Sequence, residues 1–178
     1  MSKKLRRWEL ASFLFAAVAG PLLHFTYQWS GENPIVAAFS AVNESTWEHM
    51  KLLFMPMFLF SLAEMAVLTD QYRNFLAAKA AAILLGLLLI PALYYTYTGI
   101  WGQSRAYLDI AVFYIALAAA HWLGLRLMKQ GKLNGGALQI GALLGLWALA
   151  FLFVWFTYRP PHIALFLDPV TGTYGLGG

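Results

Sequence analysis

Residues 47–68 read WEHMKLLFMPMFLFSLAEMAVL, an apolar run that begins with a few charged and polar side chains. About 20 mostly apolar residues in an α-helix are enough to cross the hydrocarbon core of a bilayer. The run has this length, so we predict that it is a transmembrane helix. Four other stretches meet the same criterion, and they cover residues 8–27, 75–95, 107–127 and 137–158.

The five stretches predict an all-α membrane protein, a compact bundle of five transmembrane helices in one domain, residues 1–178. The composition agrees, because 61% of the residues are hydrophobic and only 11% are charged, whereas soluble domains have about 25% charged residues. The chain has no cysteine, which excludes disulfides and thiolate metal sites.

Lysine and arginine predict the orientation, since they are enriched in cytoplasmic loops. With the N-terminus in the cytoplasm, only Lys51, Arg105 and Arg159 of the twelve basic residues lie on the outer side. We therefore predict a cytoplasmic N-terminus, an extracytoplasmic C-terminus and a place in the cytoplasmic (inner) cell membrane. The basic opening MSKKLRR also occurs in signal peptides, but the long apolar stretch after it contains Gly20-Pro21 and favours an uncleaved first helix. The net charge of +4 then reflects membrane orientation, and we expect no nucleic-acid partner.

Residues 43–51, NESTWEHMK, have two interpretations. Ser45 and Glu48 form a capping box, in which the serine hydroxyl accepts from the backbone N–H three residues on and the glutamate reaches back. This explains two residues without any function. Helix caps rarely contain a histidine and a lysine as well, so a functional site that includes Glu44 and His49 is the other interpretation.

The predicted topology brings three of the four histidines and most carboxylates to the outer side. We expect the tail, residues 159–178, to fold over this face because it combines apolar anchors with rigid turns. Imidazole and carboxylate groups together suit zinc and other transition metals, or general acid–base chemistry without a metal. The candidate metal ligands are His24, His49 and His162, and the candidate catalytic residues are His49, Glu48, Glu44 and Asp168.

Three of these outer residues also have purely structural interpretations. His24 follows the Gly20-Pro21 kink and could bond a carbonyl freed there. Asp109 could be an N-terminal charge that the helix dipole stabilises. Asp168, in the sequence DPVTGTYG, could bond its own downstream backbone in a turn.

Ionisable groups within the apolar spans form a second candidate layer, made of Glu64, Lys79 and His121. Charges at such depth are costly, usually paired and often functional. The layer is either a structural Glu–Lys pair with a histidine partner or part of a proton or ion route. Gly141-x-x-x-Gly145 in the fifth span predicts close helix contact, within the bundle or between copies.

Two segments carry a resemblance to a known family: HFTYQWSGENPIVAAFSAVNESTWEHMKLLFMP (residues 24–56) and PPHIALFLDPVTGTYG (residues 160–175). With these segments the chain resembles an uncharacterised family of small prokaryotic multi-pass membrane proteins with a domain of unknown function. The resemblance covers essentially the whole chain. It implies that the outer segments form one unit, and it brings no activity, substrate or cofactor.

Three functions remain open at this point. The first is a membrane hydrolase or lyase for a lipid-like substrate, whose outer site activates water, with a divalent metal such as Zn as its cofactor. The second is a small-solute or ion-coupled transporter, or an accessory subunit, in which Glu64, Lys79 and His121 relay protons. The third is a structural partner of another membrane protein. The expected partners are the lipid bilayer and either a second copy or another membrane protein.

The topology can be tested with reporter fusions. A reporter that is active only outside the cytoplasm should work when fused after Gly178 and fail when fused after Lys132, because these positions lie on opposite sides of the predicted membrane. The reverse pattern would overturn the predicted orientation.

Overall fold

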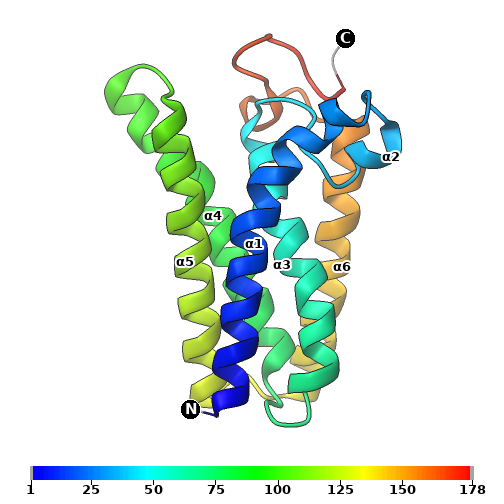
Figure 1. Ribbon diagram of the computed structural model, residues 1–178, viewed down its shortest axis with the longest axis vertical. Helices are drawn as coiled ribbons and strands as arrows, with labels where there is room; N and C mark the ends of the chain where they lie inside the picture. The colour runs from blue at the N-terminus through cyan, green and yellow to red at the C-terminus, as the bar shows by residue number, and fades with distance from the viewer. Residues whose placement is uncertain (1, 177–178) are drawn as a thin grey trace.

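The computed structural model of the chain describes residues 2–176, and among these residues all regular secondary structure is helical, with no strand (Figure 1). Met1, Gly177 and Gly178 belong to the predicted domain, and the last two to the predicted tail, but they lie outside the described residues. The long helices are α1 (Lys3–Trp29), α3 (Thr46–Leu68), α4 (Phe75–Trp101), α5 (Ala106–Gln130) and α6 (Gly136–Tyr158). Two short helices are α2 (Pro34–Ala37) and the 3-10 helix η1 (Ala164–Phe166). All five long helices have the length and apolar composition needed to cross a membrane, which indicates a multi-pass membrane protein.

The helices extend beyond the predicted spans, because capping decides where a helix ends and hydropathy does not. Helix α1 begins at Lys3, well before predicted residue 8, and its N-cap Ser2 accepts a hydrogen bond from Leu5 N at 3.2 Å. Helix α4 continues past predicted residue 95 to Trp101 and ends at Gly102, whose φ of 72° is left-handed. Glycine adopts this conformation without the strain that a side chain would add.

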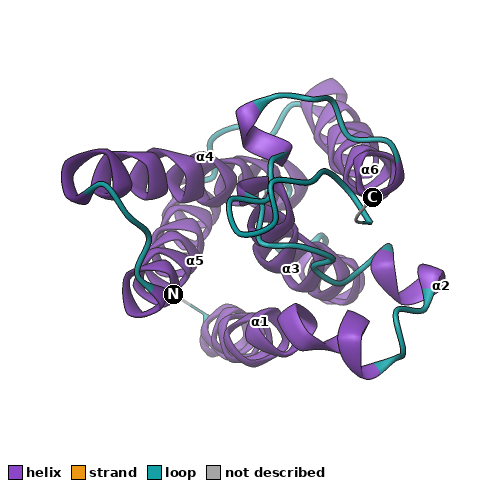
Figure 2. Ribbon diagram, turned by 90° about the horizontal axis from the view of Figure 1, so that it is seen from above, coloured by secondary structure: helices purple, strands orange, loops and turns teal. Residues whose placement is uncertain are grey.

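Helix α3 is the centre of the bundle (Figure 2). It contacts α1, α4 and α6, and α5 packs against α4 and α1. In the most apolar 18-residue stretch of α3, 61% of the residues are buried, against 11% in the corresponding stretch of α6. Aromatic contacts join α3 to α6, since the ring centroids of Phe54 and Phe153 are 4.8 Å apart, and Phe54 also stacks on Phe58 of its own helix at 5.3 Å.

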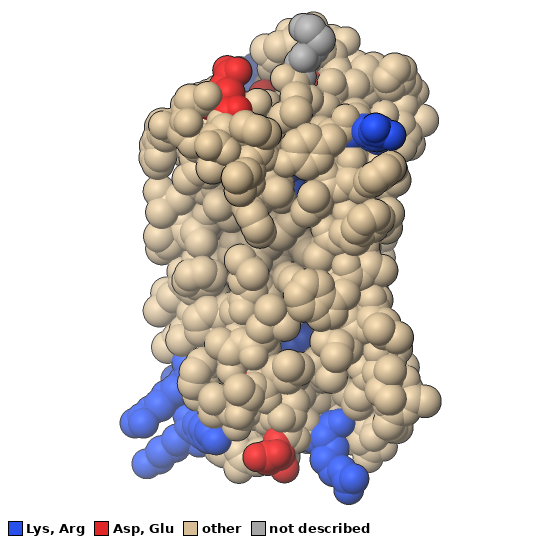
Figure 3. All heavy atoms as spheres, turned by 90° about the vertical axis from the view of Figure 1, so that its right-hand side faces the viewer, with Lys and Arg blue, Asp and Glu red and all other residues tan. Residues whose placement is uncertain are grey.

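The two ends of the bundle differ in charge. At the end that holds the start of α1, lysine and arginine side chains gather on the surface (Figure 3), and we call it the basic end. Its exposed basic residues include Lys3, Lys4, Arg6, Arg7, Arg73, Lys129 and Lys132. The opposite end, the tail end, holds α2, the start of α3, the α4–α5 loop and residues 159–176 (Figure 1).

Residues 159–176 pack against the start of α3. The ring of Phe166 in η1 lies 4.8 Å from that of Trp47, and Asn43 Nδ2 donates to Gly175 O at 2.8 Å. The glycines of α6 make no such contact, because a Cβ atom built on Gly141 or Gly145 meets nothing within 4 Å. The prediction that these glycines allow close helix contact within the bundle is therefore wrong. The alternative, contact between copies of the chain, stays a prediction.

Candidate metal centre

Three of the predicted site residues lie together at the tail end: His24 in α1, Glu44 in the loop before α3, and His49 in the first turn of α3. Glu44 Oε2 is 3.4 Å from His24 Nε2 and 3.6 Å from His49 Nε2. One ligand-type atom from each residue lies within 4.8 Å of the other two. We call this group the His–Glu–His triad.

The loop that carries Glu44 is fixed to the end of α1 by hydrogen bonds. Ser40 Oγ accepts from Tyr27 N at 2.9 Å and donates to the carbonyl of Leu23. Ala41 N donates to the same carbonyl at 3.2 Å. These bonds hold the loop beside the turn of α1 that presents His24, which is why the carboxylate reaches the imidazole.

The orientation of His49 is set by its own helix. Its Nδ1 atom lies 3.0 Å from the carbonyl oxygen of Ser45. Because a carbonyl oxygen only accepts, Nδ1 bears the hydrogen and donates it. The other nitrogen, Nε2, faces Glu44, and it has a free lone pair whenever the ring is neutral. Metal-ligating histidines are oriented in this way, with one nitrogen bonded to the protein and the other free for the ion.

Glu44 is suited to ligation because its carboxylate stays ionised. The interaction with the His24 imidazole, aided by the charges of both histidines, lowers the pKa of Glu44 below its usual range. Partial burial and the charge of Asp168 act in the opposite direction but do not cancel this effect. When the imidazoles are neutral, as ligation requires, the carboxylate of Glu44 and the lone pair of His49 are two acceptors that face each other, and a cation between them stabilises this arrangement.

The two carboxylate–imidazole distances of the triad fit a small divalent ion. Ligand atoms at about 2.1 Å from a tetrahedral ion are about 3.4 Å apart, close to the 3.4 and 3.6 Å between Glu44 and the two imidazoles. Two imidazoles and one carboxylate are the ligands of catalytic zinc sites and of mononuclear iron sites. Three protein ligands leave a coordination position for water or substrate.

The triad borders a cavity of about 910 Å³ between α1, α3, α4, α5 and the tail. This volume lies within the usual range for small-molecule sites. Pro169 and Val170 of the tail line it, so the chain after α6 contributes part of its wall. Most of the remaining wall is apolar and includes Phe25, Leu52, Ile90, Ile110, Val112 and Phe113. A polar group at one side and apolar walls elsewhere suit an amphipathic molecule.

A second polar group lines the same cavity at the start of α5. Asp109 accepts hydrogen bonds from the hydroxyl of Tyr97 and, at 2.6 Å, from that of Ser104. Asp109 lies in the first turn of α5, where the helix dipole favours a negative charge, as the structural interpretation predicted. Its place in the cavity wall was not predicted, because Tyr97 and the α4–α5 loop approach it only in the folded chain.

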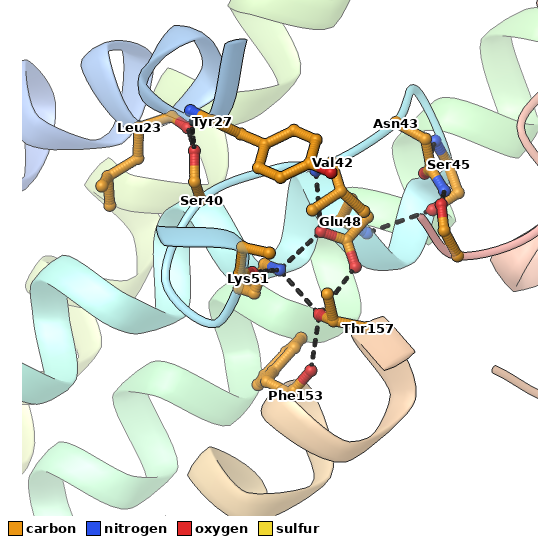
Figure 4. A network of polar contacts seen from close by, with 12 residues as sticks. Leu23, Tyr27, Ser40, Val42, Asn43, Ser45, Glu48, Lys51, Phe153 and Thr157 are labelled. Carbon is orange, nitrogen blue, oxygen red and sulfur yellow. Dashed lines mark hydrogen bonds and ion pairs between the residues drawn. The ribbon is translucent and has the colours of Figure 1, made fainter. Parts of the chain in front are cut away.

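Glu48, a predicted catalytic residue, does not join the triad but pairs with Lys51 in the interior (Figure 4). Its Oε2 atom is 2.6 Å from Lys51 Nζ and accepts from Val42 N at 3.2 Å. The capping box is therefore half right. Ser45 Oγ accepts from Glu48 N as predicted, at 3.4 Å, but the glutamate reaches back to Val42 and not to Ser45.

The Glu48–Lys51 pair joins three segments of the chain (Figure 4). Lys51 Nζ donates to Ala37 O at 2.9 Å and to Thr157 Oγ1 of α6 at 2.7 Å. Thr157 Oγ1 also lies 3.1 Å from Glu48 Oε1, to which it can donate. The side chain of Lys51 has no exposed surface, so these contacts supply all the stabilisation that its charge receives.

His162 and Asp168 are not members of the triad. The ring of His162 is exposed and stacks on Tyr174, with centroids 4.5 Å apart, so the structure does not bring it to the other histidines as predicted. Asp168 Oδ1 accepts from Val170 N at 2.7 Å and from Thr171 N at 3.3 Å. This confirms the predicted turn, which uses one oxygen, Oδ1, of the carboxylate that was predicted to be catalytic.

We call the second predicted layer, that of the ionisable groups within the apolar spans, the inner layer. It has a member that was not predicted, Glu9 of α1. Lys79 Nζ lies 2.7 Å from Glu64 Oε2 and 2.5 Å from Glu9 Oε1, and all three residues are buried. Glu9 falls within predicted span 8–27, so an acidic residue inside an apolar span was the signal for it.

His121 of α5 contacts the inner layer only indirectly. Its Nε2 atom is 3.3 Å from the hydroxyl oxygen of Ser12, and its Nδ1 atom is 3.0 Å from Leu117 O. Ser12 lies one helical turn from Glu9 on α1. Of the layer predicted from Glu64, Lys79 and His121, the glutamate and the lysine therefore form an ion pair. His121 contacts neither of them directly and is bonded to Ser12 instead.

Comparison with known proteins identifies the family. The chain belongs to a family of unknown function, DUF6512, whose model matches residues 1–176. This confirms the predicted resemblance to a family without an assigned activity. No curated protein and no solved structure matches the chain.

The buried pair predicts a large effect for Lys51→Met. The substitution leaves Glu48 buried without its cation, and breaking such a pair costs about 3–5 kcal/mol. Thermal unfolding in detergent should show a strong loss of stability, while Lys132→Met on the exposed surface should change it by less than about 0.5 kcal/mol. Equal effects of the two substitutions would contradict the structural role of the pair.

Proposed function

We propose that this member of the DUF6512 family is a metal-dependent membrane hydrolase or lyase that acts on a lipid-like substrate at the His–Glu–His triad. The observation that supports it is the convergence of two imidazoles on one carboxylate, at 3.4 and 3.6 Å, beside a largely apolar cavity of about 910 Å³. His24, Glu44 and His49 are the ligands, and zinc is the metal that best suits them.

His24, Glu44 and His49 would hold a divalent ion and leave one coordination position for water. Such an ion would supply a water of lowered pKa, the nucleophile needed to hydrolyse an ester or phosphoryl group of the substrate with release of its alcohol. The apolar residues of the cavity hold the substrate chain, and the polar head lies between the triad and Asp109, which both line the cavity.

The orientation of the site follows from the charge asymmetry. The basic end holds most exposed lysines and arginines, and such residues are retained in the cytoplasm. We therefore propose that the basic end is cytoplasmic and that the triad opens to the outer side of the inner cell membrane. A substrate would then come from the outer leaflet or from outside the cell.

A second candidate function is an ion-coupled transporter or accessory subunit. The observation that favours it is the buried Glu64–Lys79 pair, 2.7 Å apart, with His121 close by on α5. In this case the cavity binds a small solute and the inner layer relays protons. The open glycine face of α6 would serve contact with a second copy or with another membrane protein in either function.

Metal content tests the triad directly. The purified protein, stripped with a chelator and titrated with zinc, should bind one ion per chain. His24→Ala, Glu44→Ala and His49→Ala should each weaken binding roughly tenfold or more, since even supporting residues of metal sites contribute this much. His162→Ala is the matched control, because it removes a tail-end histidine that lies outside the triad, and it should bind as the unmodified chain does.

The pH dependence of zinc binding gives an independent check. Free imidazoles have a pKa of about 6.5 and must be neutral to ligate, so binding should weaken as the pH falls through about 6. If His162→Ala weakened zinc binding as much as His49→Ala, the ion would be bound at the surface, and the proposal would be contradicted. Absence of binding at neutral pH would do the same.

Activity should follow the metal. The zinc-loaded protein in micelles should hydrolyse a single-chain amphiphile with a chromogenic ester or phosphate ester as its head group. His49→Ala should abolish turnover, and His162→Ala should retain it. A water-soluble ester without the apolar chain should react more slowly, because the cavity walls contribute binding only to the chain. Turnover that survives His49→Ala would exclude the triad as the catalytic site.

A further inference from the structure

The inner layer contains three charged groups with almost no access to solvent. Lys79 of α4 lies between Glu9 of α1 and Glu64 of α3, at 2.5 and 2.7 Å. The exposed fractions of the three side chains are 3%, 2% and 0%. All three helices meet here in the interior, within the segments that are apolar enough to cross a membrane.

The charges of this group do not balance. Two ionised carboxylates and one ammonium leave a net charge of −1, and an unbalanced charge in an apolar interior is strongly unfavourable. The helix that packs on the other side, α5, contributes His121, which is bonded to Ser12 and Leu117 and to neither carboxylate. Helix α6 has no acidic, basic or histidine residue between Gly136 and Tyr158.

The carboxyl oxygens also lack donors. Each carboxyl group faces Lys79 with one oxygen, while Glu9 Oε2 and Glu64 Oε1 have no hydrogen-bond partner among residues 2–176. The two groups are close enough for each to act on the other as a like charge. A single proton on one of them removes the excess charge and supplies the missing donor. A proton on His121 would offset the excess charge but would supply no donor to the carboxyl oxygens.

We propose that Glu9, Lys79 and Glu64 form a proton-binding site that holds one proton on one of its two carboxyl groups at neutral pH. The site is separate from the His–Glu–His triad, and the proposal does not depend on the hydrolase function. It gives the bundle one bound proton on the three helices that also line the cavity.

Infrared spectroscopy of the whole protein in lipid tests this proposal, because a protonated carboxyl group absorbs apart from a carboxylate. The unmodified protein at neutral pH should show one carboxylic-acid C=O band that shifts in D₂O, a measurement that needs no variant. Both Glu9→Gln and Glu64→Gln should abolish the band, since the remaining glutamate and Lys79 then form a neutral ion pair. Lys79→Met should increase the band about twofold, because both glutamates must then be protonated.

The control is Glu32→Gln, which changes an exposed loop carboxylate and should leave the band unchanged. His121→Gln should also retain the band, because the proton is on a carboxyl group and not on the imidazole. Absence of the band in the unmodified protein would overturn the proposal, as would a band that persists in both Glu9→Gln and Glu64→Gln. A band that is absent at physiological sodium concentration and appears only when sodium is removed would assign the place to a metal cation instead and would equally overturn the proposal.

Discussion

A buried lysine that cannot reach water determines the arrangement of the tail end. Lys51 has no exposed side-chain surface, and its charge is tolerable only with close partners. These partners come from its own helix, from α2 and from α6: Glu48, Ala37 and Thr157. The need to surround one ammonium group thus draws three segments of the chain together, and the loop that carries Glu44 runs between them.

The stretch NESTWEHMK provides a helix cap and a candidate metal ligand, on different faces of one helix. Glu48 and Lys51 are one helical turn apart and face the interior. His49 is rotated by about 100° from Glu48, and this rotation directs its ring to Glu44 and the cavity. The same turn therefore anchors the loop with one face and presents a candidate ligand with the next. The cap and the candidate site therefore do not exclude each other.

The helical fold was predictable because apolar length alone reveals a spanning helix. Helix ends were less so, because caps such as Ser2 and Gly102 lie outside the apolar runs. Within the site, the proximity of His49 and Glu44 was predictable because they are five residues apart. The approach of His24 was predictable because consecutive helices usually pack side by side. His162 could not be placed, since the path of the tail depends on the packing of Phe166 against Trp47. Side-chain packing over such separations leaves no pattern in one sequence.

The position of Thr157 has a consequence for synthesis of the chain. Residues enter the membrane from the N-terminus onward, so α1 and α3 are made long before the ribosome reaches residue 157. During this interval Lys51 has Glu48 as a neighbour but lacks the hydroxyl of α6 that completes its surroundings. The tail end, with the wall that Pro169 and Val170 add to the cavity, can assemble only after residue 170 has been made. A chain released before α6 would contain all three triad residues without the enclosure around them.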